Sequence, residues 1–404
     1  MPKRTIDQVE VKGKRVLMRV DFNVPIQDGK ITDDRRIREA LPSIRSVLTR
    51  GGRLVLMSHL GRPSGKGYEA EFTLEPCAAR LTELLGAGAK GGVRFPSHDC
   101  TDGAAVSAVN MLQDGECLLL ENLRFHKQEQ KGDAEFAAKL ASYGDIYCNN
   151  AFGTCHRADA SMVAVPKAMK GKPRVCGSLV EKEIRYLSDA LSRPKRPFVV
   201  ILGGAKVSDK LPAIEFLVPK ADAIIIGGAM AYTFLKAQGK QVGSSRVEED
   251  RIADAKRALE LAASAGKQLH LPDDHVCAAK FEEGAAGEVV SGSIPEGKMG
   301  LDIGPRSAAR FAEVIRGSKT AVWNGPMGVF EWKQFAAGTK AVGEALAAAT
   351  KAGATTIVGG GDSAAAAEVL GVAEQLSHVS TGGGASLEML SGKRFESVEL
   401  LDEA

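Results

Sequence analysis

Short apolar runs alternate with longer segments of helical spacing along the whole chain. In the first half, the apolar runs lie within residues 15–25, 53–63, 116–125 and 145–154. Alternation of strands with helices is typical of parallel sheets whose strands are joined by crossover helices. Several runs are apolar without interruption, as expected for sheets covered on both faces. The pattern predicts an α/β protein built from doubly wound parallel sheets.

Four apolar runs in the second half are each followed by a glycine pair or triplet and then by a helix-like stretch. These segments begin at Phe198, Ala223, Thr355 and His378. A glycine turn lets the backbone approach a ligand closely, and the next helix opens with unpaired N–H groups. Such a turn can also serve close packing alone, but four together indicate a nucleotide or phosphate site. No segment fits a Walker-type loop or a GxGxxG turn with its ribose-binding acid.

A helical segment separates the two halves. Apolar residues keep helical spacing from Leu179 to Leu191, and Pro194 and Pro197 then block continuation of the helix. We therefore expect two α/β domains joined by a helix. The expected parts are a first domain (1–178), a linker helix (179–193), a second domain (194–388) and a C-terminal tail (389–404).

Composition adds limits to this picture. The length of 404 residues favours two or three domains, and 44% hydrophobic with 25% charged residues is ordinary for a globular protein. With 53 basic and 50 acidic residues, the net charge is only +3. This balance argues against general nucleic-acid or membrane binding, while a local basic site is still compatible with it.

The seven cysteines are irregularly spaced, and no CxxC pair occurs. Their pattern therefore predicts neither a disulfide framework nor a zinc motif. The first residues lack the apolar segment of a signal peptide, and no apolar run reaches the roughly 20 residues that span a bilayer. We expect a protein of the reducing cytoplasm.

Polar and basic residues follow each strand predicted in the first half. They are Asp21 and Asn23, then Ser58, His59, Gly61 and Arg62, then Glu121, Asn122 and Arg124, and finally His156 and Arg157. Ligands of open α/β sheets bind at the carboxyl ends of strands. Arginines that recur there suggest a small, multiply anionic ligand, because guanidinium groups match phosphate and carboxylate geometry.

Each of these residues also has an ordinary explanation. A single arginine is more often part of a surface ion pair, and we expect Arg35 and Arg38 at the surface. Asp21 could belong only to a turn. His59 and His156 could be unremarkable core or loop histidines.

Charged residues accompany the glycine turns of the second half. Lys206 and Lys210 are expected one helical turn apart after the first turn, an arrangement that the helix dipole disfavours unless an anion is present. Asp362 could be an N-cap or a magnesium ligand. Glu331 could bind a ribose, although by residue type alone an exposed loop acid is favoured.

Eleven motifs, in order, resemble those of phosphoglycerate kinases. They are RVDFNVP, DDRRIREALPSI, SHLGRP, LLENLRF, AFGTCHRADAS, ILGGAKVSDK, IIIGGAMAYTFLK, GLDIGP, VWNGPMGVFE, IVGGGDSAAA and HVSTGGGASLE, which extend from about Arg15 to Glu388. The resemblance implies reversible phosphoryl transfer from 1,3-bisphosphoglycerate to ADP, giving 3-phosphoglycerate and ATP in glycolysis. It also implies a Mg²⁺ cofactor, a monomer, transfer in a cleft that closes between the domains, and a tail that returns to the first domain.

The resemblance assigns residues to the two ligands. At the glycerate it implies Asp21, Asn23, Arg36, His59, Leu60, Gly61, Arg62, Arg124 and Arg157. At the nucleotide it implies Lys206, Asn324, Glu331, Gly360, Gly361, Asp362, Ser363, Gly382, Gly383 and Gly384, with Asp362 as the metal ligand. Arg36, Lys206 and Lys210 match the charges around the transferred phosphoryl group.

Departures from the family pattern are small. Ser363 replaces a threonine and keeps the hydroxyl, and the tail after Lys393 lacks the usual Leu-Pro-Gly, so its packing is open. Three other functions fit parts of the sequence. A nicotinamide oxidoreductase lacks its glycine motif here, and RNA binding lacks interleaved aromatics, which make up 5% of residues. A non-catalytic phosphometabolite-binding protein is opposed only by Lys206 and Lys210.

Overall fold

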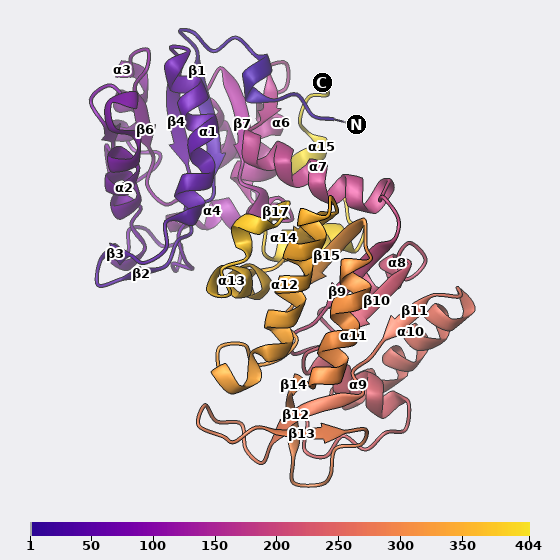
Figure 1. Ribbon diagram of the computed structural model, residues 1–404. Helices are drawn as coiled ribbons and strands as arrows, with labels where there is room; N and C mark the ends of the chain where they lie inside the picture. The colour runs from indigo at the N-terminus through magenta and orange to yellow at the C-terminus, as the bar shows by residue number, and fades with distance from the viewer. Residues whose placement is uncertain (1) are drawn as a thin grey trace. The chain divides into compact units, whose positions relative to one another are not determined.

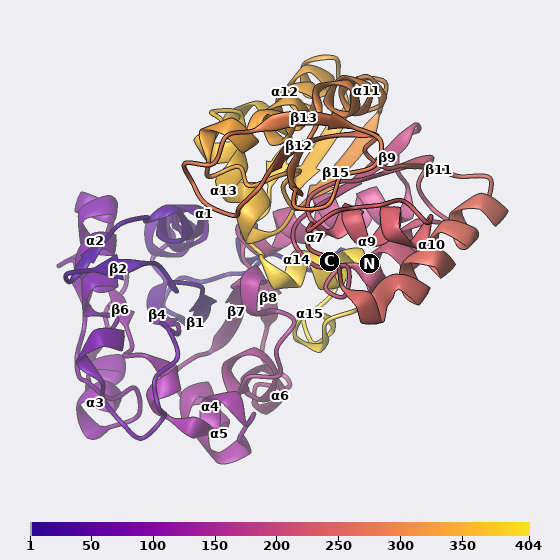
Figure 2. The ribbon, with the colours of Figure 1, turned by 90° about the horizontal axis from the view of Figure 1, so that it is seen from below.

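The computed structural model describes residues 2–404, which divide into two compact units. One unit comprises the residues up to Arg185 together with Arg394–Ala404, and the other comprises Tyr186–Lys393. Figure 1 shows the helices and strands of each unit, and Figure 2 shows them turned by 90°. Among these residues, no helix is long and apolar enough to cross a membrane.

The first unit contains a sheet in which, within residues 2–404, six parallel strands pair in the order β5-β6-β4-β1-β7-β8. The strands are β1 (Arg15–Val20), β4 (Arg53–Met57), β5 (Val93–Arg94), β6 (Cys117–Leu119), β7 (Ile146–Asn150) and β8 (Arg174–Cys176). Every residue of β6 and β7 is buried. Burial on both faces accounts for the uninterrupted apolar runs of the sequence.

Helices cover this sheet. They are α1 (Arg35–Thr49), α2 (Glu75–Leu85), α3 (Gly103–Met111), α4 (Lys127–Gln130), α5 (Ala134–Ala141) and α6 (Val165–Ala168), and the hairpin β2 (Ile26–Gln27) with β3 (Lys30–Ile31) precedes α1. In α1, Ile37, Ile44 and Val47 are fully buried, because their spacing puts them on one face of the helix. That face fixes where the first turn of α1, with Arg36, lies against the sheet.

The C-terminal tail packs on the first unit. The Arg174 N–H donates to Asp402 Oδ2 (2.9 Å), and the Asp402 N–H donates back to the Arg174 carbonyl (2.7 Å). Phe395 and Leu401 are buried, and the short helix α15 (Glu396–Glu399) lies between them. Apolar anchors and a strand-like exchange of hydrogen bonds thus hold a tail that lacks Leu-Pro-Gly.

The second unit contains a sheet in which, across residues 2–404, six parallel strands pair in the order β11-β10-β9-β15-β16-β17. The strands are β9 (Phe198–Leu202), β10 (Ala223–Ile226), β11 (Gln268–His270), β15 (Thr320–Asn324), β16 (Thr355–Val358) and β17 (His378–Val379). The predicted fold class, with doubly wound parallel sheets in two units, is confirmed.

The second unit also contains an antiparallel sheet that the sequence pattern did not predict. Its strands pair in the order β13-β12-β14, with β12 (Asp274–Ala278), β13 (Glu288–Ser291) and β14 (Met299–Ile303). The strand β13 is largely exposed, so its sequence does not show the apolar run by which buried strands are recognised.

Helices flank the sheets of the second unit. They are α8 (Leu211–Leu217), α9 (Met230–Ala237), α10 (Ile252–Ser264), α11 (Pro305–Arg316), α12 (Ala337–Lys351), α13 (Gly361–Val369) and α14 (Gly384–Leu390). The helix α7 (Ser178–Ser192) includes the residues at which the two units divide.

Three of the four glycine turns lead directly into helices, namely α9, α13 and α14, but the first turn does not. After β9 the chain passes through turns, and α8 begins only at Leu211. The prediction that Lys206 and Lys210 lie one helical turn apart is therefore wrong. Pro212 supplies the reason, because it fits the first turn of a helix but would break the interior of one that began near residue 205.

Candidate functional site

The carboxyl ends of β1 and β4 bring several predicted residues together. The Arg36 guanidinium donates to Asp21 Oδ2 (2.5 Å) from the first turn of α1. The Asn23 side-chain oxygen accepts from the Gly61 N–H (2.8 Å), and the Asn23 N–H donates to Asp21 Oδ1 (3.3 Å). Asp21 thus takes part in a turn and also holds Arg36 in place.

His59 lies in this group with its ring almost fully buried, at 2% exposure. Its Nδ1 is 3.0 Å from Nη2 of Arg19, a residue of β1 that is 0% exposed. Because a guanidinium can only donate, Nδ1 must accept. His59 is therefore held as the neutral tautomer with its proton on Nε2.

The pKa of His59 lies well below its usual value, first because of burial and then because of the charges of Arg19, Arg124, Arg157 and Arg36. Four arginines are thus close enough to one imidazole for their charges to act on it. A buried region with this much positive charge attracts a multiply charged anion.

Arg124 is the most deeply buried of the predicted glycerate-binding arginines in this group. The residue is 3% exposed, and its Nη1 donates to the Gly61 carbonyl (2.9 Å). Its Nη2 is 3.6 Å from a carboxylate oxygen of Asp159, and neither Nε nor Nη2 has a hydrogen-bond partner. Burial lowers the pKa of Arg124, the charges of Arg157 and Arg19 lower it further, and Asp159 opposes them. Buried donors without partners are costly, and an anionic ligand would satisfy them.

The loop that follows β4 is held by Asn122. The Leu60 N–H donates to Asn122 Oδ1 (3.2 Å), and Asn122 Nδ2 donates to the Leu60 carbonyl (2.7 Å). The next residue, Gly61, has φ +61, and a Cβ there would lie 2.4 Å from the Phe72 ring. A larger residue would thus displace the backbone that contacts both Asn23 and Arg124.

Two predicted glycerate residues are less closely tied to this group. Arg157 is half-buried and acts on His59 and Arg124 through its charge. Arg62 is exposed, and its position next to Gly61 is what relates it to the group. Its role stays a prediction.

Sequence reasoning missed Arg19 and its partners. The Arg19 Nε–H donates to Ser161 Oγ (2.8 Å), and the Ser161 N–H donates to Glu129 Oε2 (2.9 Å). Glu129 is 0% exposed; burial raises its pKa, and the charge of Arg19 opposes that rise. The available signal was an arginine inside a buried strand, which is rare unless the charge is paired.

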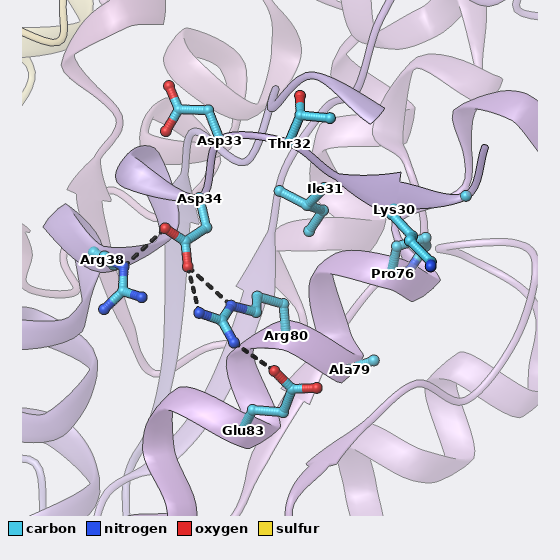
Figure 3. Close-up of a pocket in the computed structure, with 11 residues that line it drawn as sticks. Lys30, Ile31, Thr32, Asp33, Asp34, Arg38, Pro76, Ala79, Arg80 and Glu83 are labelled. Carbon is cyan, nitrogen blue, oxygen red and sulfur yellow. Dashed lines mark hydrogen bonds and ion pairs between the residues drawn. The ribbon is translucent and has the colours of Figure 1, made fainter. Parts of the chain in front are cut away.

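Other charged residues near the start of α1 form ion pairs around a separate hollow of about 590 Å³ in the first unit (Figure 3). Asp34 lies 2.8 Å from Arg38 Nε and 2.7 Å from Arg80 Nη2, and Arg80 Nη1 lies 2.5 Å from Glu83. Partial burial raises the pKa of Asp34, but the two arginines lower it by more, so the net shift is downward. Arg38 is thus in a surface ion pair, as expected from the sequence.

A hollow of about 470 Å³ lies among the glycine turns of the second unit. Phe281, Met299, Leu301 and Val329 contribute apolar surface to it, and the exposed carboxylates of Glu331 and Asp362 also line it. A largely apolar wall with few polar groups suits the base and ribose of a nucleotide.

A smaller hollow of about 170 Å³ shares Asp362 with the larger one. It is lined by Lys210, Asn324, Gly325, Gly360, Gly361, Asp362, Ser363, Gly383, Gly384 and Leu387. The Lys210 ammonium donates to Asn324 Oδ1. Burial lowers the pKa of Lys210, while the charges of Asp209 and Asp362 oppose this shift. Asn324 Nδ2 is buried without a partner, and the amino end of α13 opens here with unpaired N–H groups.

The structure corrects one alternative for Asp362. The N-cap of α13 is Gly360, at φ +96, and Asp362 lies inside the first turn with an exposed side chain. Asp362 is therefore not an N-cap, because only glycine readily adopts the backbone angle at the capping position. Ser363 is 1% exposed, and its hydroxyl accepts a hydrogen bond from the Gly325 N–H.

Some glycines of the turns serve close packing, and others leave room for a ligand. A Cβ on Gly203 would lie 2.2 Å from the Pro326 carbonyl, and one on Gly228 would lie 2.5 Å from the Gly204 N. These two glycines allow close packing. A Cβ on Gly204 or Gly361 would meet nothing within 4 Å, so these positions face open space that a ligand can occupy.

Lys206 and Gly382 are not among the residues that line either hollow. Lys206 is exposed and contributes to lowering the pKa of Glu248. The Gly382 N–H donates to Ser380 Oγ (3.0 Å). Their contacts with a nucleotide stay predictions.

Two further residues of the second unit carried no assignment from the sequence. Phe281 lines the larger hollow while 65% exposed, and no sequence signal marks it. The Asp302 carboxylate accepts hydrogen bonds from the N–H groups of Gly338 (2.7 Å) and Ile303 (2.9 Å). Burial raises the pKa of Asp302 to about 7, although these two hydrogen bonds lower it. Its side chain fastens the end of β14 to the start of α12. A buried acid in the GLDIGP motif was the available signal.

We predict that His59 stays a neutral imidazole protonated on Nε2 at pH 6, because its depressed pKa disfavours the charged form and Arg19 donates to Nδ1. Nitrogen-15 NMR of the ring measures both properties. In Arg19→Met the donor to Nδ1 is lost, and the preference for one tautomer should disappear. A ring protonated on Nδ1 in the unmodified protein would contradict the assignment.

The depressed pKa also has a consequence for stability. The unfolded chain takes up a proton on His59 below about pH 6.5 and the folded chain does not, so the folded state loses stability as pH falls. His59→Gln should reduce this loss by at most about 1.4 kcal/mol per pH unit.

Comparison with known proteins agrees with the geometry. The family model described as phosphoglycerate kinase matches residues 6–393. Phosphoglycerate kinases from Rhodopirellula baltica and Chlorobium chlorochromatii are 57% and 53% identical to this chain, with 100% of each chain covered. The solved phosphoglycerate kinase from Coxiella burnetii is 37% identical with a TM-score of 0.88, covering 99% of this chain and 98% of that chain. The one from Pyrococcus horikoshii is 32% identical with a TM-score of 0.84, covering 98% of both. The chain thus has an arginine cluster in one unit and glycine turns in the other, and it resembles phosphoglycerate kinases along nearly its whole length. The chain belongs to the phosphoglycerate kinase family.

Proposed function

We propose that this chain catalyses reversible, Mg²⁺-dependent phosphoryl transfer from the carboxyl phosphate of 1,3-bisphosphoglycerate to ADP, which gives 3-phosphoglycerate and ATP. One observation supports the anionic substrate most strongly. The Arg124 guanidinium is buried among other positive charges, and its Nε and Nη2 lack hydrogen-bond partners. A coupled assay of ATP formation from the two substrates tests the proposal, and an active site that binds both without turnover would instead indicate a binding protein.

In this proposal the first unit binds the glycerate. Arg36, Arg124 and Arg157 supply charge, and His59 donates from Nε2, since Arg19 occupies its Nδ1. Asp21 and Asn23 orient Arg36 and the Gly61 backbone, while Leu60 and Arg62 flank that backbone. Because these groups are fixed before binding, little freedom is lost when the anion arrives.

The second unit binds the nucleotide in this proposal. The larger hollow, with Glu331 beside an apolar wall, suits the nucleoside, and the smaller hollow suits the phosphates. Lys210, Asn324 and the N–H groups of α13 would contact phosphate oxygens. Lys206 and the turn at Gly382–Gly384 are proposed to complete this side.

Phosphoryl transfer of this kind needs no covalent intermediate on the protein. An oxygen of ADP attacks the phosphorus of the acyl phosphate in line, the bond to the carboxyl oxygen breaks, and the carboxylate leaves. Catalysis then depends on position and on charge placed around the transferred group. We propose Arg36, Lys206 and Lys210 for that charge.

The residues present fit a magnesium ion. Asp362 is an exposed carboxylate shared by the two hollows, and Mg²⁺ takes one or two carboxylates together with phosphate oxygens and water. Bound there with the nucleotide, the ion would neutralise phosphate charge. Asp362 would hold the ion, and Lys210 and Asn324 would orient the phosphates beside it.

Because the proposed groups belong to separate units, we propose that the units close to bring them together and to exclude water. Small-angle scattering of the free protein, with each ligand and with both, should show a smaller radius of gyration only when both are bound. An unchanged radius in an active preparation would count against closure.

The cytoplasmic location, the monomeric state and a place in glycolysis stay predictions from the sequence and from the family resemblance.

Arg124→Met should raise the half-saturation for the glycerate by roughly 10–100-fold, because charged hydrogen bonds to a buried guanidinium are worth about 1.5–3 kcal/mol. Nucleotide affinity should change little. Calorimetric titration of each ligand measures both quantities. Arg38→Met is the matched control, since Arg38 is paired with Asp34 at the surface. Equal losses in the two variants would refute the assignment of Arg124.

Lys206→Ala should lower turnover far more than it weakens nucleotide binding, because loss of a contact made in the transition state costs about 3–4 kcal/mol. The coupled assay gives turnover, and calorimetry gives binding. Turnover like that of the unmodified chain would remove Lys206 from the mechanism.

Asp362→Asn should weaken ADP binding in the presence of Mg²⁺ and have little effect without it, because the amide is a poorer ligand for a hard cation. Titration calorimetry with and without the ion distinguishes the two conditions. The same affinity change in both would show that Asp362 acts on the nucleotide directly.

A further inference from the structure

A group of three metal-ligating side chains lies in the first unit, outside the residues proposed for either substrate. Asp99 and Cys100 belong to the loop between β5 and α3, and His126 lies just after the 3₁₀ turn η4 (Leu123–Phe125). One ligand atom from each residue lies within 4.8 Å of the others. His126 lies 26 positions after Cys100 and 27 after Asp99, so the spacing does not show a zinc motif.

The Asp99 carboxylate, the His126 ring and the backbone of Cys100 are held in place by neighbours. Asp99 Oδ1 accepts from the Thr101 N–H (2.7 Å) and hydroxyl (3.0 Å), and it lies 3.1 Å from His126 Nε2. The Cys100 carbonyl accepts from the Tyr143 hydroxyl (3.2 Å). The His126 ring lies against Phe136, with centroids 5.1 Å apart. Ligands fixed by surrounding contacts are typical of metal sites.

Solvent reaches two of the three side chains, and the third is buried. Cys100 is 1% exposed, whereas the side chains of His126 and Asp99 are 21% and 41% exposed. An ion can therefore reach the imidazole and the carboxylate from solvent and contact the sulfur on its inner side. Three protein ligands would leave one tetrahedral position to water.

The donor set selects the class of ion. A thiolate with an imidazole and a carboxylate suits Zn²⁺ and similar borderline cations, whereas Mg²⁺ and Ca²⁺ require oxygen ligands. Tetrahedral bonds of about 2.0–2.3 Å put ligand atoms roughly 3.3–3.8 Å apart, so the three groups need to approach by only about 1 Å. We propose that Asp99, Cys100 and His126 form a Zn²⁺ site that fastens η4 to the loop before α3.

This proposal is independent of the catalytic function. The ordinary alternative is an ion pair between Asp99 and His126 beside a buried thiol that takes no part. The two differ in whether sulfur bonds to a metal, and that difference can be observed directly.

The test uses Co²⁺ as a spectroscopic substitute for Zn²⁺ on the full chain after treatment with a chelator. One equivalent of Co²⁺ should produce the sulfur-to-cobalt charge-transfer band and the visible bands of a tetrahedral site, and Zn²⁺ should abolish them by displacement. Cys100→Ser should lose the charge-transfer band. The matched control Cys117→Ser, which changes another fully buried cysteine of the same unit, should keep it.

His126→Gln gives a second variant at a partly exposed position, in case Cys100→Ser does not fold. It should weaken Co²⁺ binding by more than the 10–100-fold that changes in outer contacts typically cause. Zn²⁺ should also raise the unfolding temperature of the unmodified chain and of Cys117→Ser but not of His126→Gln. No charge-transfer band in the unmodified chain, or an equal band in Cys100→Ser, would overturn the proposal.

Discussion

Parallel pairing of strands is the constraint on which the rest of this structure depends. Strands that run in the same direction end at the same edge of their sheet, so the loops that follow them converge. In the first unit, the neighbours β1 and β4 in this way bring Asn23 into hydrogen-bonding contact with Gly61, and Arg19 with His59. In the second unit, β9, β15 and β16 are adjacent, and their glycine turns and Asn324 surround the two hollows. Sheet topology thus brings the residues of both groups together.

The two units use this constraint in chemically different ways. The first places side-chain charge in a buried setting, where Arg19, Arg36, Arg124 and Arg157 act on His59. The second relies mainly on backbone, with Gly204 and Gly361 facing open space and α13 opening beside them. Buried guanidinium groups suit a small anion held on all sides. Backbone N–H groups suit phosphates that must be approached closely along a longer ligand.

Buried charge also has a cost, which the structure offsets locally. Arg19 is compensated by Ser161 and Glu129, and it fixes the tautomer of His59 by occupying Nδ1. Arg124 has only partial compensation from Asp159. The difference is informative, because a structural arginine is fully paired while a ligand-binding one keeps donors available. On this basis we propose positioning as the role of Arg19 and ligand binding as the role of Arg124.

The sequence by itself determined the α/β class, the helix between two halves and most candidate positions, because buried parallel strands and glycine turns leave strong local patterns. Ordered motifs then identified the family. Tertiary structure decided what spacing does not record. It showed that α8 begins after the turn with Lys206, since Pro212 excludes an earlier start, and it separated Gly203, which packs, from Gly204, which faces open space. It also joined Arg19 to His59, and Asp99 and Cys100 to His126, across long stretches of chain. Such groupings depend on which strands become neighbours, and that is fixed by packing of the whole sheet and not by any local run of residues.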